Sequence, residues 1–202
     1  MKSLHPARPA RVRTSTTRRA GAATVATVAL LACGACSGTV DVSLGGSDGI
    51  SGPALEQDLS DRVVELTDLA PASVDCPDGL TAEVGATTTC EMVHGGVRAT
   101  LDVEATSVAE DEATLDFSWQ VEPGSQSLLT EVVADTIADA FAAETGLVLT
   151  GVTCPASELD GTPGTVMTCE AETSGGRSGP VELQVRGAEG MRVDFSWRLA
   201  DR

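Results

Sequence analysis

The chain of 202 residues contains no tyrosine, two tryptophans, three phenylalanines, two histidines and a single lysine. His94 is the only histidine beyond residue 32, so an imidazole-based catalytic or metal centre would depend on that side chain alone. The sequence has no H-E-x-x-H motif and no glycine-rich phosphate loop. We therefore predict a protein that is not an enzyme and that binds no cofactor and no metal. His94 is expected to lie in a solvent-exposed turn.

Positive charge is also scarce. Beyond residue 32 the sequence has seven arginines, no lysine and all 30 acidic residues, which gives a formal charge of 7 − 30 = −23. Such a chain repels nucleic-acid phosphates and anionic lipid headgroups, so we exclude nucleic acid as a partner. A cationic partner, or simple solubility, accounts for the charge better. The acidic run Glu110-Asp111-Glu112 lacks the D-x-D-x-D-G order of a calcium loop and is expected to be a solvated turn.

Residues 1–32 have the features of an export signal and are predicted to be a signal peptide outside the fold. Basic side chains precede an uncharged run from Ala20 to Ala32 that is too short for a permanent transmembrane helix. Leu30-Leu31-Ala32-Cys33 resembles the bacterial lipobox, in which the cysteine after the cleavage site receives a diacylglyceryl group. We expect lipidation of Cys33 and attachment to the extracytoplasmic face of the cell membrane. The alternative is an ordinary secretory signal that is cleaved nearby.

The rest of the sequence contains an internal duplication. The motifs Cys76-Pro77, Cys90-Glu91 and Leu115–Trp119 (Leu-Asp-Phe-Ser-Trp) recur as Cys154-Pro155, Cys169-Glu170 and Val193–Trp197 (Val-Asp-Phe-Ser-Trp). The offsets are 154 − 76 = 78, 169 − 90 = 79 and 195 − 117 = 78, so one structural unit occurs twice. We predict a flexible tether over residues 33–52, one repeat over 53–122 and a second repeat over 123–202.

Four cysteines lie within the predicted repeats, and four cysteines allow three pairings. The duplication favours one of them, because each repeat should be closed within itself: Cys76 with Cys90 and Cys154 with Cys169. A four-cysteine metal site is the alternative, but the sequence lacks the close C-x-x-C pairs that are typical of zinc. The role of Cys36 stays open.

Each repeat begins with a helical pattern and continues as strands. Pro53 is placed as a first helical residue, and Leu55, Leu59, Val63 and Leu66 follow at helical spacing. In the second repeat Ser125 or Ser127 is the expected cap, Gly146 the expected end, and Val133, Ile137 and Phe141 form the matching face. Four short strands with glycine turns at 95–96 and 175–176 follow each helix. The predicted fold class is α+β, with two tandem repeats, each one helix packed on a four-stranded antiparallel sheet.

The last strand of each repeat alternates strictly between apolar and polar residues. Its apolar residues, including Trp119 and Trp197, are predicted to pack in the core, so its polar residues face outward. These outward residues form our candidate binding face: Asp116, Ser118, Gln120, Asp194, Ser196 and Arg198. The alternative interpretation is that Asp-x-Ser is simply favourable solvent-facing strand chemistry.

The Val-x-Cys-Pro run, the second Cys-Glu and the Gly-Gly hairpin resemble an actinobacterial domain of unknown function, number 4333, over about residues 55–122 and 127–200. That family occurs in exported and lipoprotein-like chains and brings no established activity. In layout alone, the tandem helix-plus-four-strand units are similar to the secreted beta-lactamase inhibitory protein.

Two functional hypotheses follow. The first is a membrane-tethered, non-enzymatic binding or accessory module of the cell envelope with a protein or cell-wall partner. The second, which the similarity in layout implies, is a proteinaceous inhibitor of a secreted or envelope enzyme. A third possibility, a hydrolase, lacks a plausible site.

Overall fold

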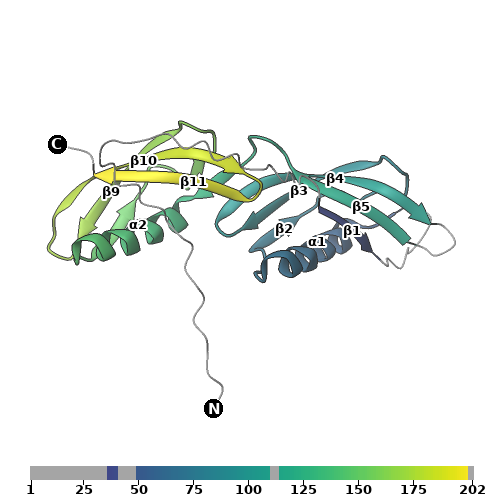
Figure 1. Cartoon of the computed structure of the whole chain (residues 1–202), viewed down its shortest axis with the longest axis horizontal. Helices are drawn as coiled ribbons and strands as arrows, with labels where there is room; N and C mark the ends of the chain where they lie inside the picture. Colours follow the sequence, from purple (N-terminus) through teal and green to yellow (C-terminus); the bar gives the residue numbers. More distant parts are fainter. Residues whose placement is uncertain (1–35, 41–48, 110–113, 200–202) are drawn as a thin grey trace, which may run out of the picture. The chain divides into compact units, whose positions relative to one another are not determined.

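The computed structural model describes residues 36–40, 49–109 and 114–199 (Figure 1). The predicted signal peptide, the lipidation residue Cys33 and the acidic run 110–112 lie outside the described residues. No helix in the described ranges is long and apolar enough to span a membrane.

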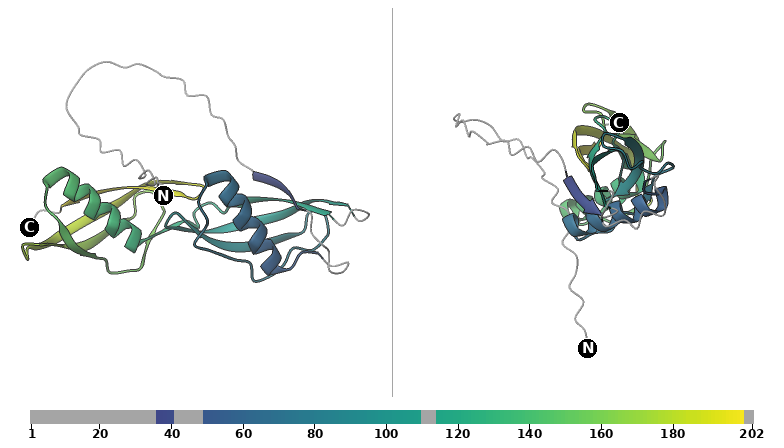
Figure 2. Two further views of the ribbon diagram at one scale, coloured as in Figure 1. Left: turned by 90° about the horizontal axis from the view of Figure 1, so that it is seen from below. Right: turned by 90° about the vertical axis from the view of Figure 1, so that its right-hand side faces the viewer.

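The first repeat consists of one helix and an antiparallel sheet with the strand order β1-β5-β4-β3-β2. The helix lies across one face of this sheet (Figure 2). Residues of the helix and of three strands, β3 to β5, contribute to one buried core. The elements are α1 (Gly52–Thr67), β1 (Cys36–Val40), β2 (Ser73–Asp75), β3 (Thr87–His94), β4 (Val97–Ala109) and β5 (Thr114–Val121).

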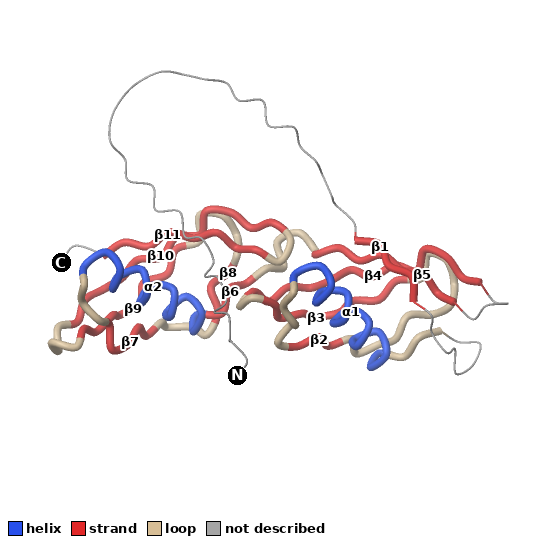
Figure 3. The backbone as a smooth tube through the Cα atoms, turned by 60° about the horizontal axis from the view of Figure 1, so that its bottom comes forward, coloured by secondary structure: helices blue, strands red, loops and turns tan. Residues whose placement is uncertain are grey.

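The second repeat has the same plan, with a sheet in the order β11-β10-β9-β7. Its elements are α2 (Thr130–Thr145), β7 (Leu149–Thr153), β9 (Val166–Thr173), β10 (Ser178–Glu189) and β11 (Arg192–Leu199). The α+β fold class is thus confirmed: each repeat has a helix, a curled antiparallel sheet and one disulfide (Figure 3).

Two short strands that the sequence did not predict connect the repeats. β6 (Ser127–Leu129) pairs with β8 (Glu158–Asp160) of its own repeat and also with the first residues of β4, where Leu128 lies opposite Val97. Val97 is 4 % exposed and belongs to the core of the second repeat. The backbone also approaches closely here, since a Cβ at Gly96 would come within 2.7 Å of the Val132 side chain. The turn therefore needs glycine at this position for space as well as for its positive φ.

The helices follow the predicted apolar pattern with two corrections. Leu55, Leu59 and Val63 are buried, but Leu66 is 61 % exposed, because α1 ends one residue later and Asp68 turns the chain in the left-handed region. α2 ends at Gly146 as predicted. Its N-cap is Leu129 and not a serine. Ser127 instead lies in β6, and Ser125 accepts a hydrogen bond from the Thr100 backbone N–H at 3.1 Å.

The predicted disulfides Cys76–Cys90 and Cys154–Cys169 are both present. Each joins the segment after its helix to the strand that follows, and Cys76, Cys90 and Cys169 are almost fully buried. The aromatic core is less complete than predicted. Phe117 is fully buried, whereas Trp119 and Trp197 are half-buried at the margins of the two cores.

The structure differs from the predicted flexible tether. Residues Cys36–Val40 pair antiparallel with β5, so a segment that looks like a linker in composition completes a sheet edge. Ile50 is 4 % exposed and exchanges two backbone hydrogen bonds of 2.9 Å with Leu80. The first repeat therefore begins before residue 53. Residues 41–48 of the predicted tether lie outside the described residues.

Candidate binding face

The six candidate residues lie where the alternation predicts. In β5 the apolar Leu115 and Phe117 point into the core, so Asp116, Ser118 and Gln120 lie on the opposite side of the sheet. In β11 the residues Asp194, Ser196 and Arg198 hold the equivalent places. We call the sheet surface that faces away from the helix the outer face of each repeat. Gln120, Asp194 and Arg198 are exposed, and the other three side chains are half-buried.

The outer face of the first repeat is rich in carboxylates because its strands place acids side by side. Ser118 lies opposite Glu104, and Gln120 opposite Asp102. Asp116 accepts a hydrogen bond of 2.5 Å from the Ser107 hydroxyl across the same pair of strands. On β3 to β5 this face therefore carries four carboxylates and one guanidinium: Glu91, Asp102, Glu104, Asp116 and Arg98.

The outer face of the second repeat repeats the Asp-x-Ser pattern with different chemistry. Arg198 stands where the first repeat has Gln120, and its Nε and Nη2 donate to Glu182 Oε1 at 2.9 and 2.6 Å. Arg186 Nε donates to the Ser196 hydroxyl at 2.8 Å. Asp194 accepts from Arg192 at 2.8 and 3.0 Å. The two Asp-x-Ser motifs are therefore not equivalent. In the second repeat, arginines of the same sheet donate hydrogen bonds to the aspartate and the serine of the motif.

An ion-pair network that sequence reasoning missed links the repeats. Arg98 Nε, on β4, lies 2.9 Å from Glu158 Oε1, on β8, and Arg98 also pairs with Glu91. The Ser127 hydroxyl donates to Glu158 Oε2 at 2.6 Å. This hydrogen bond, together with Arg98, lowers the pKa of the Glu158 carboxyl, and the bond to Glu158 raises the pKa of Arg98. No local sequence pattern predicts that Arg98 and Glu158, which are sixty residues apart, are partners.

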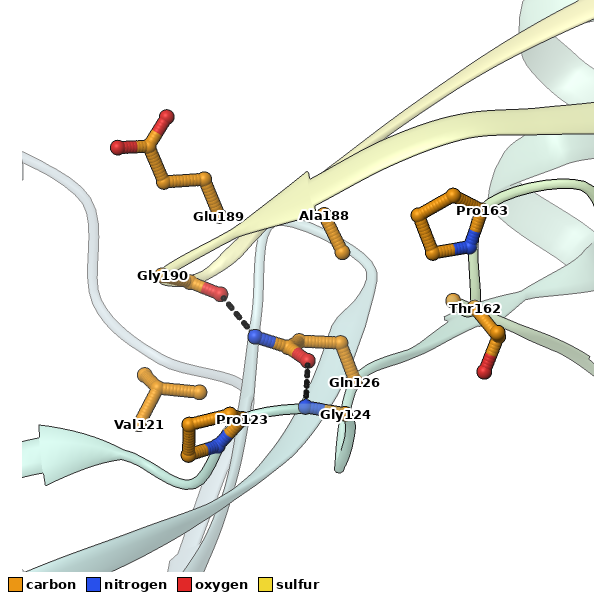
Figure 4. Close-up of a pocket in the computed structure, with 10 residues that line it drawn as sticks. Val121, Pro123, Gly124, Gln126, Thr162, Pro163, Ala188, Glu189 and Gly190 are labelled. Carbon is orange, nitrogen blue, oxygen red and sulfur yellow. Dashed lines mark hydrogen bonds between the residues drawn. The ribbon is translucent and has the colours of Figure 1, made fainter.

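A cavity of about 330 Å³ lies at the same junction, lined by residues that include Val121, Pro123, Pro163 and Ala188 (Figure 4). Gln126 is its buried polar side chain, 6 % exposed. The amide oxygen of Gln126 accepts from the Gly124 N–H at 3.1 Å, and its nitrogen donates to the Gly190 carbonyl at 3.2 Å. Both ends of the amide are thus engaged, one with the loop that follows β5 and the other with the turn between β10 and β11.

His94 differs from the expected solvent-exposed turn residue. It is the last residue of β3, opposite Val97, and is half-buried with no hydrogen-bond partner for its buried Nδ1 among the described residues. Burial lowers the pKa of the imidazole. Over the described ranges, no three His, Cys, Asp or Glu side chains gather closely enough to hold a metal ion.

The fold and face together define a disulfide-stabilised, two-repeat α+β protein whose first repeat carries an acidic sheet surface. The chain belongs to the family described as a domain of unknown function (DUF4333), whose model matches residues 31–109 and again 113–190. The first match includes β1 to β4, and the second includes β5 to β10. Neither the curated proteins nor the solved structures gave a match.

Proposed function

We propose that this protein is an exported lipoprotein, anchored through Cys33, that acts as a non-enzymatic binding module of the cell envelope. Its outer face in the first repeat binds a basic segment of a partner protein. The observation that carries the proposal is the row of carboxylates on neighbouring strands, with Arg98 as the one cation on the same part of the face. The lipobox-like sequence before Cys33 supports the export and the anchor.

The sheet favours this role because it holds the carboxylates in fixed positions. Side chains directly opposite on antiparallel strands are about 5 Å apart, so Asp102 and Glu104 present their charge beside Gln120 and Ser118 with little freedom. The disulfide of Cys90 fixes the neighbouring strand β3. A surface of one charge sign steers an oppositely charged partner and makes its association rate sensitive to salt.

The second repeat supports the first in this proposal and does not duplicate its chemistry. Arg198 pairs with Glu182 and Arg192 pairs with Asp194, so its outer face is nearer to neutral. Exposed pairs of this kind contribute little to stability, roughly 0–1 kcal/mol each, but they reduce the field that a basic ligand would meet.

The test is affinity capture from a native envelope extract with oxidised residues 36–202 as bait, Cys36 replaced by Ser, followed by quantitative mass spectrometry. A double variant, Asp102→Lys with Glu104→Lys, reverses charge on the proposed face. A matched control, Asp135→Lys with Asp139→Lys, makes the same change in net charge at two exposed positions of α2.

A basic partner that the face variant loses and the helix control retains is the expected result. Equal loss from both variants would show that only net charge attracts the partner, and capture of nothing above background would contradict the binding role. If the partner proves to be an enzyme whose activity falls on binding, the protein is an inhibitor, as the layout of two tandem units suggested.

A further inference from the structure

The two repeats end in nearly the same strand, but the outer edges of those strands differ. In β5 the residues Leu115–Trp119 have β4 on one side and β1 on the other. In β11 the residues Val193–Trp197 have β10 on one side. On the other side no strand of the described part of the chain lies along β11 (Figure 3).

The burial of the two strands differs in the same way. Leu115 and Phe117 are fully buried, whereas Val193 is 8 % exposed and Phe195 is only half-buried. Leu199, at the end of β11, is 57 % exposed. An added strand would cover apolar side chains of this kind through cross-strand contacts.

We propose that the open edge of β11 is a strand-accepting site that binds an extended segment of a partner protein as an antiparallel strand. The chemistry of the segment is read from β1, the strand that covers the equivalent edge of β5. By analogy with Cys36–Val40, the bound segment has five uncharged, mostly small or β-branched residues. An acidic residue follows them, as Asp41 follows Val40 in the sequence. Backbone hydrogen bonds supply the affinity in such strand addition, and alternate side chains supply the specificity.

The acidic position follows from the register. Val40 lies opposite Leu115, so adding the repeat offset of 78 places the equivalent residue of the ligand opposite Val193. The next ligand residue then falls opposite Arg192, whose side chain is 73 % exposed. In the first repeat the corresponding position is Thr114, which is uncharged. β10 and β11 together carry three acids and three arginines, so the edge has no net charge to repel such a segment.

A partner other than a second copy that lends its β1 is favoured by a count of strand pairs. Each copy has one β1, and β1 already pairs with β5 of its own chain. Lending β1 to the β11 of another copy breaks one five-residue ladder for each ladder that forms. A segment from a different protein adds a ladder without breaking one. Its binding therefore increases both the number of backbone hydrogen bonds and the buried apolar area.

The probe is a synthetic peptide of residues 35–42 with Ser in place of Cys36 and Cys in place of Ser37. The protein is the full chain in mild detergent with Cys33 and Cys36 replaced by Ser. Ser37 lies opposite Ser118 in β5, so the same register places the peptide cysteine opposite Ser196 in β11. Opposite positions in antiparallel strands are about 4.5–5.5 Å apart between Cα atoms, within reach of a disulfide.

With the peptide cysteine supplied as a mixed disulfide with an aromatic thiol, the protein thiolate displaces that thiol. We expect this exchange to be several-fold faster for the Ser196→Cys variant than for the matched Ser118→Cys variant, whose edge β1 covers. A peptide with its cysteine moved to position 38 should react more slowly. Equal rates for the two variants, or equal rates for the two peptides, would overturn the site. Cross-linking of residue 37 to residue 196 between two copies of the protein would overturn the choice of occupant.

A charge exchange tests the register independently of any cysteine. Arg192→Glu should weaken binding of the peptide roughly two- to fivefold, and Lys in place of Asp41 in the peptide should restore it. Unchanged affinity in both combinations would contradict the register. The site does not depend on the acidic face, so the Asp102→Lys, Glu104→Lys variant should bind the peptide as the parent chain does. Unchanged tryptophan emission shows that each variant is folded.

Discussion

The duplication allows the same substitution to be compared in two environments, and Phe117→Ala with Phe195→Ala is the sharpest pair. Phe117 is fully buried, and the guanidinium of Arg62 lies 5.2 Å from the centre of its ring. Phe195 has the same neighbours in sequence but sits in the open edge strand β11 and is half-buried. Sequence alone would assign both residues the same contribution to stability.

The structure assigns them different magnitudes. Removing a fully buried phenylalanine costs about 3–5 kcal/mol, because transfer and cavity terms add. Loss of the cation–π contact with Arg62 adds about 0.5–1 kcal/mol. For Phe195 part of the side chain is already in water and no enclosed cavity is left at an edge strand, so the expected cost is about 1–2 kcal/mol.

Urea unfolding of the oxidised chain measures the two free energies of unfolding. Trp119 and Trp197 serve as separate fluorescence reporters of the two repeats when the other is replaced by Phe, with each single-tryptophan chain as its own reference. A cost for Phe195→Ala that equals or exceeds the cost for Phe117→Ala would refute the reasoning from burial, and with it the view that the edge of β11 is open.

Four further predictions concern the disulfides, the junction and pH. Replacing Cys76 and Cys90 by Ser should lower the free energy of unfolding by about 3 kcal/mol, measured in urea, and an unchanged value would contradict the chain-entropy account. Gln126→Ala should cost about 1–3 kcal/mol and speed amide exchange at Gly124, because it removes both hydrogen bonds of the Gln126 side-chain amide; no change in exchange would contradict its role in fixing that loop. The pKa of His94 is lowered in the folded chain, so the unfolded chain binds the proton more readily and stability should fall as pH drops below about 6.5; His94→Gln should remove that slope in thermal melts. The pKa of Glu158 is also lowered, so its contribution is present above about pH 4.5 and lost as pH falls through its folded pKa; Glu158→Gln should flatten the stability curve there and nowhere else.

The parts of the fold that depend on local pattern could be predicted residue by residue. Leu55, Leu59 and Val63 are buried because their spacing places them on one face of a helix. Asp116 and Ser118 face outward because strand side chains alternate. The error at Leu66 lies at a helix end, where the periodic pattern continues for one residue longer than the helix packs.

The outward orientation of the candidate residues was predictable from the alternation, but the chemistry around them was not. Two identical Asp-x-Ser motifs differ because Ser118 lies opposite Glu104, whereas Ser196 lies opposite Gln184 and accepts a hydrogen bond from Arg186. The strand register that creates these neighbours is set by a bulge and a hairpin turn, and no pattern within the motif itself encodes them.

The sequence by itself determined that one unit occurs twice, which cysteines pair, and which residues of each helix and strand face inward. These properties follow from repetition and from periods of 3.6 and 2 residues, which act over short stretches of chain. Only the tertiary structure decided that Cys36–Val40 covers β5, that β6 joins the first sheet, and that Arg98 meets Glu158. Those contacts join segments about thirty to eighty residues apart, and they form because a sheet edge, a carboxylate or an apolar side chain gains a partner wherever the folded chain brings one.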